Sequence, residues 1–178
     1  MDDREELIRG KIRNEDFAEM AHLEGTRENM RDFLIREKGF IPAEIEINPV
    51  FRIELAKCNA EVSIDLAINL SGMYFMVIKC IAGAVESWER YVISFARAVK
   101  EYQIPYAAIA DGKNIRIFDA ISGSFLSESA TRLFDRSEAL DIIRDFKKID
   151  RSEKNLEKER RIIYAFESIK CPSLEKEE

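Results

Sequence analysis

Two charged residues, Asp65 and Lys79, interrupt apolar stretches of the sequence. Apolar side chains alternate through residues 62–70, which predicts a strand with Asp65 in its middle, pointing away from the apolar face. Residues 74–81 are almost wholly apolar, with Lys79 as their one charge, and this pattern is typical of a strand buried on both faces. A Ser-Gly turn at 71–72 joins the two strands as a hairpin, so we expect Lys79 to face Asp65 across the pair.

Such a pair has two interpretations. In the simpler one, Asp65 and Lys79 form an ion pair that satisfies two partly buried charges and does nothing more. In the other, they belong, as members or remnants, to the site of a metal-dependent phosphodiesterase, where a carboxylate binds the ion and a lysine stabilises charge developing on the phosphate.

Other catalytic arrangements find little support. The single histidine, His22, lies near the edge of the chain, which argues against a serine–histidine–acid triad. The three cysteines are widely spaced and do not match a zinc site. No GxxxxGK[ST] motif occurs, so we expect no P-loop ATPase motor in this chain.

The elements that must position the pair follow from periodicity and turn residues. A helix is expected from Thr26, as its N-cap, to Lys38, with Gly39 ending it. The remaining expected helices cover residues 86–102, 137–149 and the charged run 151–161 with the apolar stripe 162–169 that follows it. The expected strands are 45–54, 62–70, 74–81, 106–110 and 114–118.

This order predicts an α/β protein with a mixed β-sheet of about five strands flanked by helices, plus a C-terminal helical extension. We divide the chain into an N-terminal helical arm (1–23), a core (24–130) and the extension (131–178). The apolar stripe of the extension needs a partner surface, which is either the core or a second copy of the chain.

Composition limits the partners and the location. The chain has 178 residues, 28 of them basic and 34 acidic, so its net charge is −6 and any DNA contact must depend on a local basic patch. No apolar run approaches the ~18 residues that a membrane helix needs. The charged N-terminus and the odd number of cysteines lead us to expect a reduced, cytoplasmic protein.

Three stretches carry a resemblance to a known family: EGTRENMRDFLIREKGF, SIDLAINLSGMYFMVIKCIAG and ARAVKEYQIPYAAIADGKNIRIFD. In this order and spacing, over about residues 24–127, the chain resembles the N-terminal nuclease domain of type I restriction-enzyme R subunits, which belongs to the PD-(D/E)XK superfamily. The resemblance implies a restriction-endonuclease-like fold, here as a stand-alone domain without the motor, and Mg²⁺-dependent hydrolysis of DNA.

The resemblance also implies roles for particular residues. Asp65 corresponds to a metal ligand, and Glu24 matches a glutamate on the first helix that often completes the site. This sequence departs from the family strand pattern V-(I/V)-E-x-K. Lys79 stands where the glutamate belongs, so the lysine is displaced by two residues. A cation at a ligand position repels a divalent metal. Arg90 and Arg97 share one helix face beside the site and are candidates for phosphate contacts, with salt bridges as the simpler alternative.

Three hypotheses therefore stand. The first is a Mg²⁺-dependent endonuclease in which Asp65 and Glu24 bind the metal and Lys79 is the displaced catalytic lysine. The second, which the altered motif and the acidic charge favour, is a catalytically inactive relative that binds nucleic acid or a partner protein. The third is a homodimeric assembly factor whose C-terminal helices form the interface.

Overall fold

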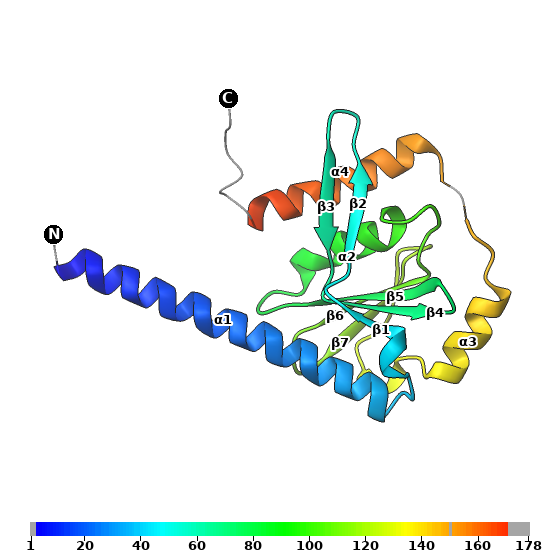
Figure 1. The fold of residues 1–178 in the computed structure, drawn as a ribbon, viewed down its shortest axis with the longest axis horizontal. Coiled ribbons are helices and arrows are strands. Elements are labelled where there is room, and N and C mark those ends of the chain that lie inside the picture. The colour runs from blue at the N-terminus through cyan, green and yellow to red at the C-terminus, as the bar shows by residue number, and fades with distance from the viewer. Residues whose placement is uncertain (1–2, 150, 171–178) are drawn as a thin grey trace.

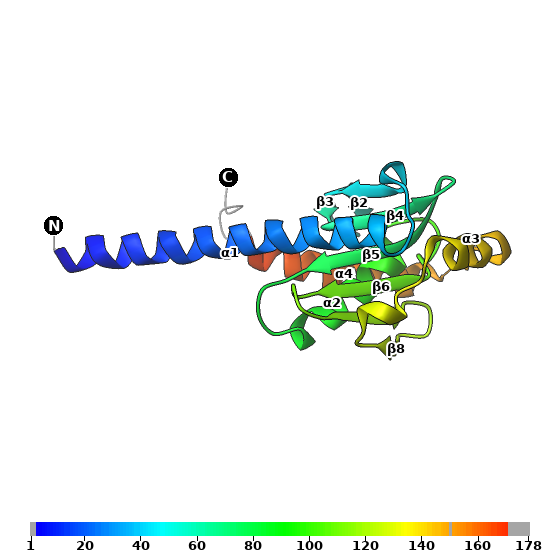
Figure 2. The same cartoon turned by 90° about the horizontal axis from the view of Figure 1, so that it is seen from below.

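A computed structural model describes the chain over residues 3–149 and 151–170, and the side chains over 18–149 and 151–167. Its centre is a six-stranded mixed sheet with helices on both faces (Figures 1 and 2). The strand order is β1 (Ile45–Ile47), β4 (Leu66–Leu70), β5 (Met73–Cys80), β6 (Tyr106–Ala110), β7 (Ile115–Asp119) and β8 (Ser124–Ser127). The expected α/β class is confirmed, with one strand more than expected because the polar stretch around Phe125 pairs with β7 as an edge strand.

Only β5 and β6 run parallel, and α2 (Glu86–Ala98) connects them. The other neighbours in the six-stranded sheet are antiparallel. On one face of the sheet, α2 and α4 (Glu153–Lys170) cover a core that includes Val77 and Ile109. On the other face, α1 (Asp3–Arg36) and α3 (Arg136–Asp145) cover a core that includes Ile78 and Ala108. Because successive residues of a strand point to opposite faces, the apolar runs of β5 and β6 supply both cores at once.

A second sheet consists of the hairpin β2 (Val50–Glu54) and β3 (Asn59–Ser63), which projects past the main sheet beside α4 (Figure 1). The single strand expected over 45–54 is wrong, because the chain breaks at Asn48, whose φ is 48°. The strand expected over 62–70 also breaks, at residues 64–65, so Asp65 lies between β3 and β4 rather than in mid-strand. The alternating apolar residues change cores at the second break: Ile64 packs in the core under α2 and α4, whereas Leu66 and Ile68 pack in the core under α1 and α3.

The first helix is longer than expected. Thr26 is 5% exposed and lies within α1, so its expected role as an N-cap is wrong, and the helix runs without a break from Asp3 to Arg36. The C-terminal part of α1 packs on the sheet through Met30 and Leu34, while its N-terminal part extends beyond the sheet (Figure 2). Gly39, with φ of 75°, follows the end of the helix as expected. Two short 3₁₀ helices, η1 (Pro42–Glu44) and η2 (Ala130–Arg132), complete the elements.

The apolar stripe of α4 has its partner within the same chain. Ile163 is fully buried, and the Phe166 ring lies 5.4 Å from Trp88 and 5.3 Å from Tyr91, both on α2. The core therefore covers Ile163 and Phe166 of this stripe, whereas Ala165 is exposed and the side chain of Ile169 lies outside the described ones. Among the described residues, no helix is both long enough and apolar enough to cross a membrane.

Candidate functional site

Asp65 sits where the chain passes from the small sheet to the large one, and its backbone is held from the β1–β2 turn. The amide of Asn48 donates to the Asp65 carbonyl at 3.0 Å. The Asn48 side chain in turn accepts a hydrogen bond from Arg27 of α1, also at 3.0 Å. Asparagine tolerates the left-handed conformation that this turn requires. The turn therefore ties α1 and the start of β4 to one point.

The Asp65 carboxylate is bound by β5. Lys79 Nζ donates to Asp65 Oδ2 at 2.5 Å, and the backbone amide of Cys80 donates to the same oxygen at 2.8 Å. The Lys79 and Asp65 side chains are 12% and 14% exposed. The expected contact between the two residues is confirmed, although Asp65 reaches it from the break rather than from a paired strand. The ammonium group supplies the positive charge that a carboxylate in this position needs.

Aromatic side chains of α2 line the other side of the lysine. Lys79 Nζ lies 5.5 Å from the centroid of the Trp88 ring, in cation–π range. Trp88 meets Tyr91 edge to face at 5.4 Å. The Tyr91 hydroxyl lies 2.5 Å from Glu167 Oε1 of α4. Burial, then the hydrogen bond to Glu167 and the charges of Glu167 and Asp65, raise the pKa of Tyr91, so this hydroxyl stays protonated and donates.

The sequence did not identify Tyr91 and Glu167 as neighbours of the Asp65 cluster. The apolar stripe 162–169 was the available signal, because it required a partner surface and Glu167 lies within it. Sequence alone could not identify α2 as that surface.

Cys80 contributes its backbone rather than its thiol. Burial and the nearby Asp65 charge raise the pKa of the thiol to about 12, and the positive charges of Lys79 and Arg27 offset only part of this effect. A thiol held protonated is a poor nucleophile and a poor metal ligand.

The residues around Asp65 do not fit the metal site that the resemblance implies. Glu24 is exposed on α1, and within the described part of the chain no hydrogen bond or ion pair joins it to the Asp65 cluster. Over the described residues, no group of three or more His, Cys, Asp and Glu side chains is arranged to hold a metal ion. Asp65 Oδ2 already accepts two hydrogen bonds, one of them from a cation. Magnesium prefers several oxygen ligands, so the donor set is inadequate.

Arg90 and Arg97 take part in the contact between α2 and α4. Arg97 Nη1 and Arg90 Nη2 each lie 3.2 Å from Glu159 of α4. Arg97 also donates to the carbonyls of Ala120 and Ile121, and its side chain is 10% exposed. This burial leaves Arg97 little access to a phosphate, whereas Arg90 is about half exposed. Both residues therefore form salt bridges, which was the simpler of the two alternatives.

Comparison of the chain with protein-family models, curated proteins and solved structures finds no match in any of the three.

Proposed function

We propose that this chain is a catalytically inactive, restriction-endonuclease-like domain that works as a binding module. One observation carries the proposal: the ammonium group of Lys79 binds Oδ2 of Asp65, the residue that the resemblance identifies as a metal ligand. A fixed cation at that point repels a divalent ion and neutralises the carboxylate. The pair is then a structural link between β5 and the β3–β4 break.

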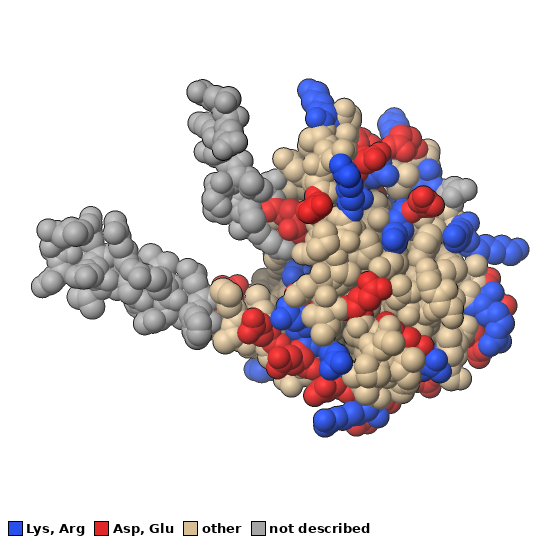
Figure 3. Space-filling view, viewed as in Figure 1, with Lys and Arg blue, Asp and Glu red and all other residues tan. Residues whose placement is uncertain are grey.

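Charge favours a protein as the partner over a nucleic acid. The chain carries a net charge of −6, and acidic and basic side chains are interspersed on the face shown in Figure 3. Nucleic-acid binding depends on clustered Lys and Arg that neutralise phosphates. Arg97, one of the two candidates for phosphate contact, is engaged with Glu159.

The alternative is a Mg²⁺-dependent endonuclease that uses Asp65 and Glu24 as ligands and Lys79 as the catalytic lysine. It requires Lys79 to leave Asp65 and a second carboxylate to approach, and the described contacts supply neither. The retained aspartate is its main support, and the experiment below separates it from the binding module.

The test is cleavage of plasmid and single-stranded DNA with Mg²⁺ or Mn²⁺ by the wild type and by Asp65→Ala. We expect no cleavage by either protein. Cleavage that disappears in Asp65→Ala would overturn the proposal and establish a nuclease, whereas cleavage that persists would indicate a contaminant or another site. Gel-shift assays with labelled duplex and single-stranded oligonucleotides at low salt then test the partner class. Salt-dependent binding of either oligonucleotide would mean that the partner of this module is a nucleic acid rather than a protein.

A further inference from the structure

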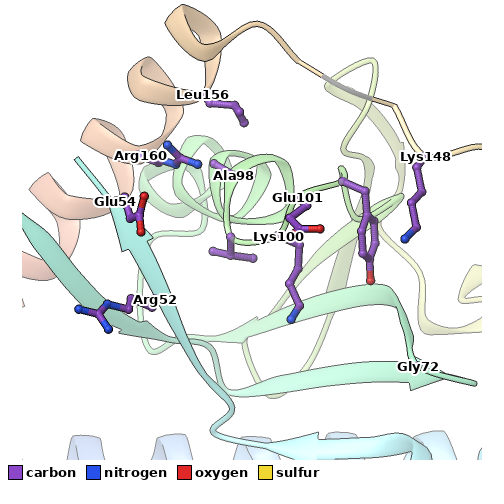
Figure 4. A pocket seen from close by; sticks show the side chains of 11 residues that line it. Arg52, Glu54, Gly72, Ala98, Lys100, Glu101, Lys148, Leu156 and Arg160 are labelled. Carbon is purple, nitrogen blue, oxygen red and sulfur yellow. The ribbon is translucent and has the colours of Figure 1, made fainter. Parts of the chain in front are cut away.

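A pocket of about 550 Å³ lies between β2, the C-terminal end of α2 and α4 (Figure 4). Its walls come from β2, the β4–β5 turn, the residues that follow α2, the segment before α4 and α4 itself. This volume falls within the range of small-molecule sites and exceeds the space that a single phosphate ion needs. The pocket shares no lining residue with the Asp65 cluster.

The lining is basic in an acidic protein. Four lining residues are cationic and two are anionic, an excess of two positive charges in a chain with a net charge of −6. The cations are Arg52, Lys100, Lys148 and Arg160, and the anions are Glu54 and Glu101. In Figure 4, Arg160 reaches in from α4, Lys100 from the end of α2 and Lys148 from the segment before α4, while Arg52 points away from these three.

The two lysines among these cations are not neutralised by neighbouring carboxylates. Within the described residues, no carboxylate lies within ion-pair distance of Lys100 or Lys148. Arg160 pairs through Nη1 with Glu153, a largely exposed side chain. The Arg160 side chain is itself only 18% exposed, and among the described residues its buried Nε has no hydrogen-bond partner, so this donor remains for a ligand.

Aromatic rings hold the two lysines instead. Lys100 Nζ lies 5.1 Å from the centroid of the Tyr74 ring and 5.6 Å from that of Phe51. Lys148 Nζ lies 5.2 Å from the Tyr102 ring. A ring face positions an ammonium group without removing its charge and leaves N–H donors for another acceptor. Two oriented ammonium groups and a guanidinium therefore line one cavity.

We propose that this pocket binds a small molecule that carries two or more phosphate groups. Phosphate oxygens match lysine and arginine donors, and the cavity has room for more than one phosphate. The proposal is independent of the binding module, because it uses different residues.

The test is isothermal titration calorimetry of the full chain with tripolyphosphate at low salt. We compare the wild type, the Lys100→Gln/Lys148→Gln double variant and, as a control, Lys113→Gln, an exposed lysine of the β6–β7 turn. Each lost lysine–phosphate contact lowers affinity about tenfold, so the double variant binds about a hundredfold more weakly. The control binds as the wild type does. Circular dichroism establishes that each variant is folded.

The proposal would be overturned by no saturable binding by the folded wild type, by an equal loss in Lys113→Gln, or by no loss in the double variant. A short single-stranded oligonucleotide serves as competitor to identify the source of the phosphate. Weak competition, compared at equal phosphate concentration, supports a free small molecule. An oligonucleotide that binds more tightly than tripolyphosphate, with the same dependence on Lys100 and Lys148, overturns it in favour of a nucleic-acid backbone.

Discussion

Replacing Glu159 by glutamine removes the negative charge that joins α4 to α2 while keeping the size of the side chain. Glu159 is 5% exposed and accepts hydrogen bonds from Ser94 at 2.6 Å and from Arg97 and Arg151 at 3.2 Å. Its pair with Arg90, also at 3.2 Å, is partly open to solvent. Without the carboxylate, Arg97 remains buried with no opposite charge.

The expected loss in the free energy of unfolding follows from the burial of the paired charges. Removing one partner of a buried ion pair costs about 3–5 kcal/mol, whereas an exposed pair contributes at most about 1 kcal/mol. The pair with Arg97 belongs to the first class, so we expect Glu159→Gln to lower the free energy of unfolding by about 3–5 kcal/mol. Glu157→Gln is the matched control on the same helix, because Glu157 pairs with a largely exposed Arg161 at 3.1 Å, and it costs at most about 1 kcal/mol.

The assay is urea unfolding followed by circular dichroism and by the fluorescence of Trp88. Trp88 is the single tryptophan of the chain and contacts Phe166 of α4, so its emission reports on the α2–α4 contact. A loss for Glu159→Gln no larger than that for Glu157→Gln would refute the reasoning, because it would mean that the buried charges contribute no more than surface pairs.

The same variant has a defined pH dependence. Burial alone would raise the pKa of Glu159, but the hydrogen bond from Ser94 and the charges of Arg90 and Arg97 outweigh it and hold this pKa below the ordinary 4.5. The unfolded chain then binds the proton first as pH falls, so the stabilisation is complete above about pH 4.5 and disappears as pH drops through the folded pKa. The difference between the wild type and Glu159→Gln should narrow below that pH. A constant difference down to strongly acidic pH would contradict the lowered pKa.

The remaining predictions concern the Asp65 cluster and the β6–β7 turn. Lys79→Met should destabilise the protein by about 3–5 kcal/mol, and adding Asp65→Asn should recover part of the loss in a double-mutant cycle measured by urea unfolding; additive losses would contradict a coupled pair. Gly112→Ala should lower the melting temperature more than Gly72→Ala. Both glycines have positive φ, but only at Gly112 does an added Cβ lie 3.0 Å from a hydroxyl of α1. Equal shifts in melting temperature would argue against this close packing. Cys80 should resist iodoacetamide in the folded Cys58→Ser/Cys171→Ser background and react on unfolding, as measured by mass spectrometry; rapid labelling without urea would contradict its burial and raised pKa.

Some of the fold could be read from local pattern. The apolar run of β5, the amphipathic α2 and the hairpin of β6 and β7 were each predicted at nearly their observed positions, because period and turn chemistry are local properties. The contact between Asp65 and Lys79 was also predicted, since two charges in adjacent apolar strands have few other partners. Because Lys79 neutralises Asp65, the sequence alone already favours an ion pair over a metal ion at this position.

What only the tertiary structure decided depends on residues far apart in the chain. The chain changes sheet at Asn48 and again at Asp65, but the apolar pattern does not reveal the second break, because Ile64 and Leu66 are both buried although they pack in different cores. Sequence could not choose between the core and a second copy as the partner of α4, because an apolar stripe specifies burial and not the surface that buries it. The basic pocket could not be predicted either, because its lining residues are far apart in the sequence until folding brings β2, α2 and α4 together.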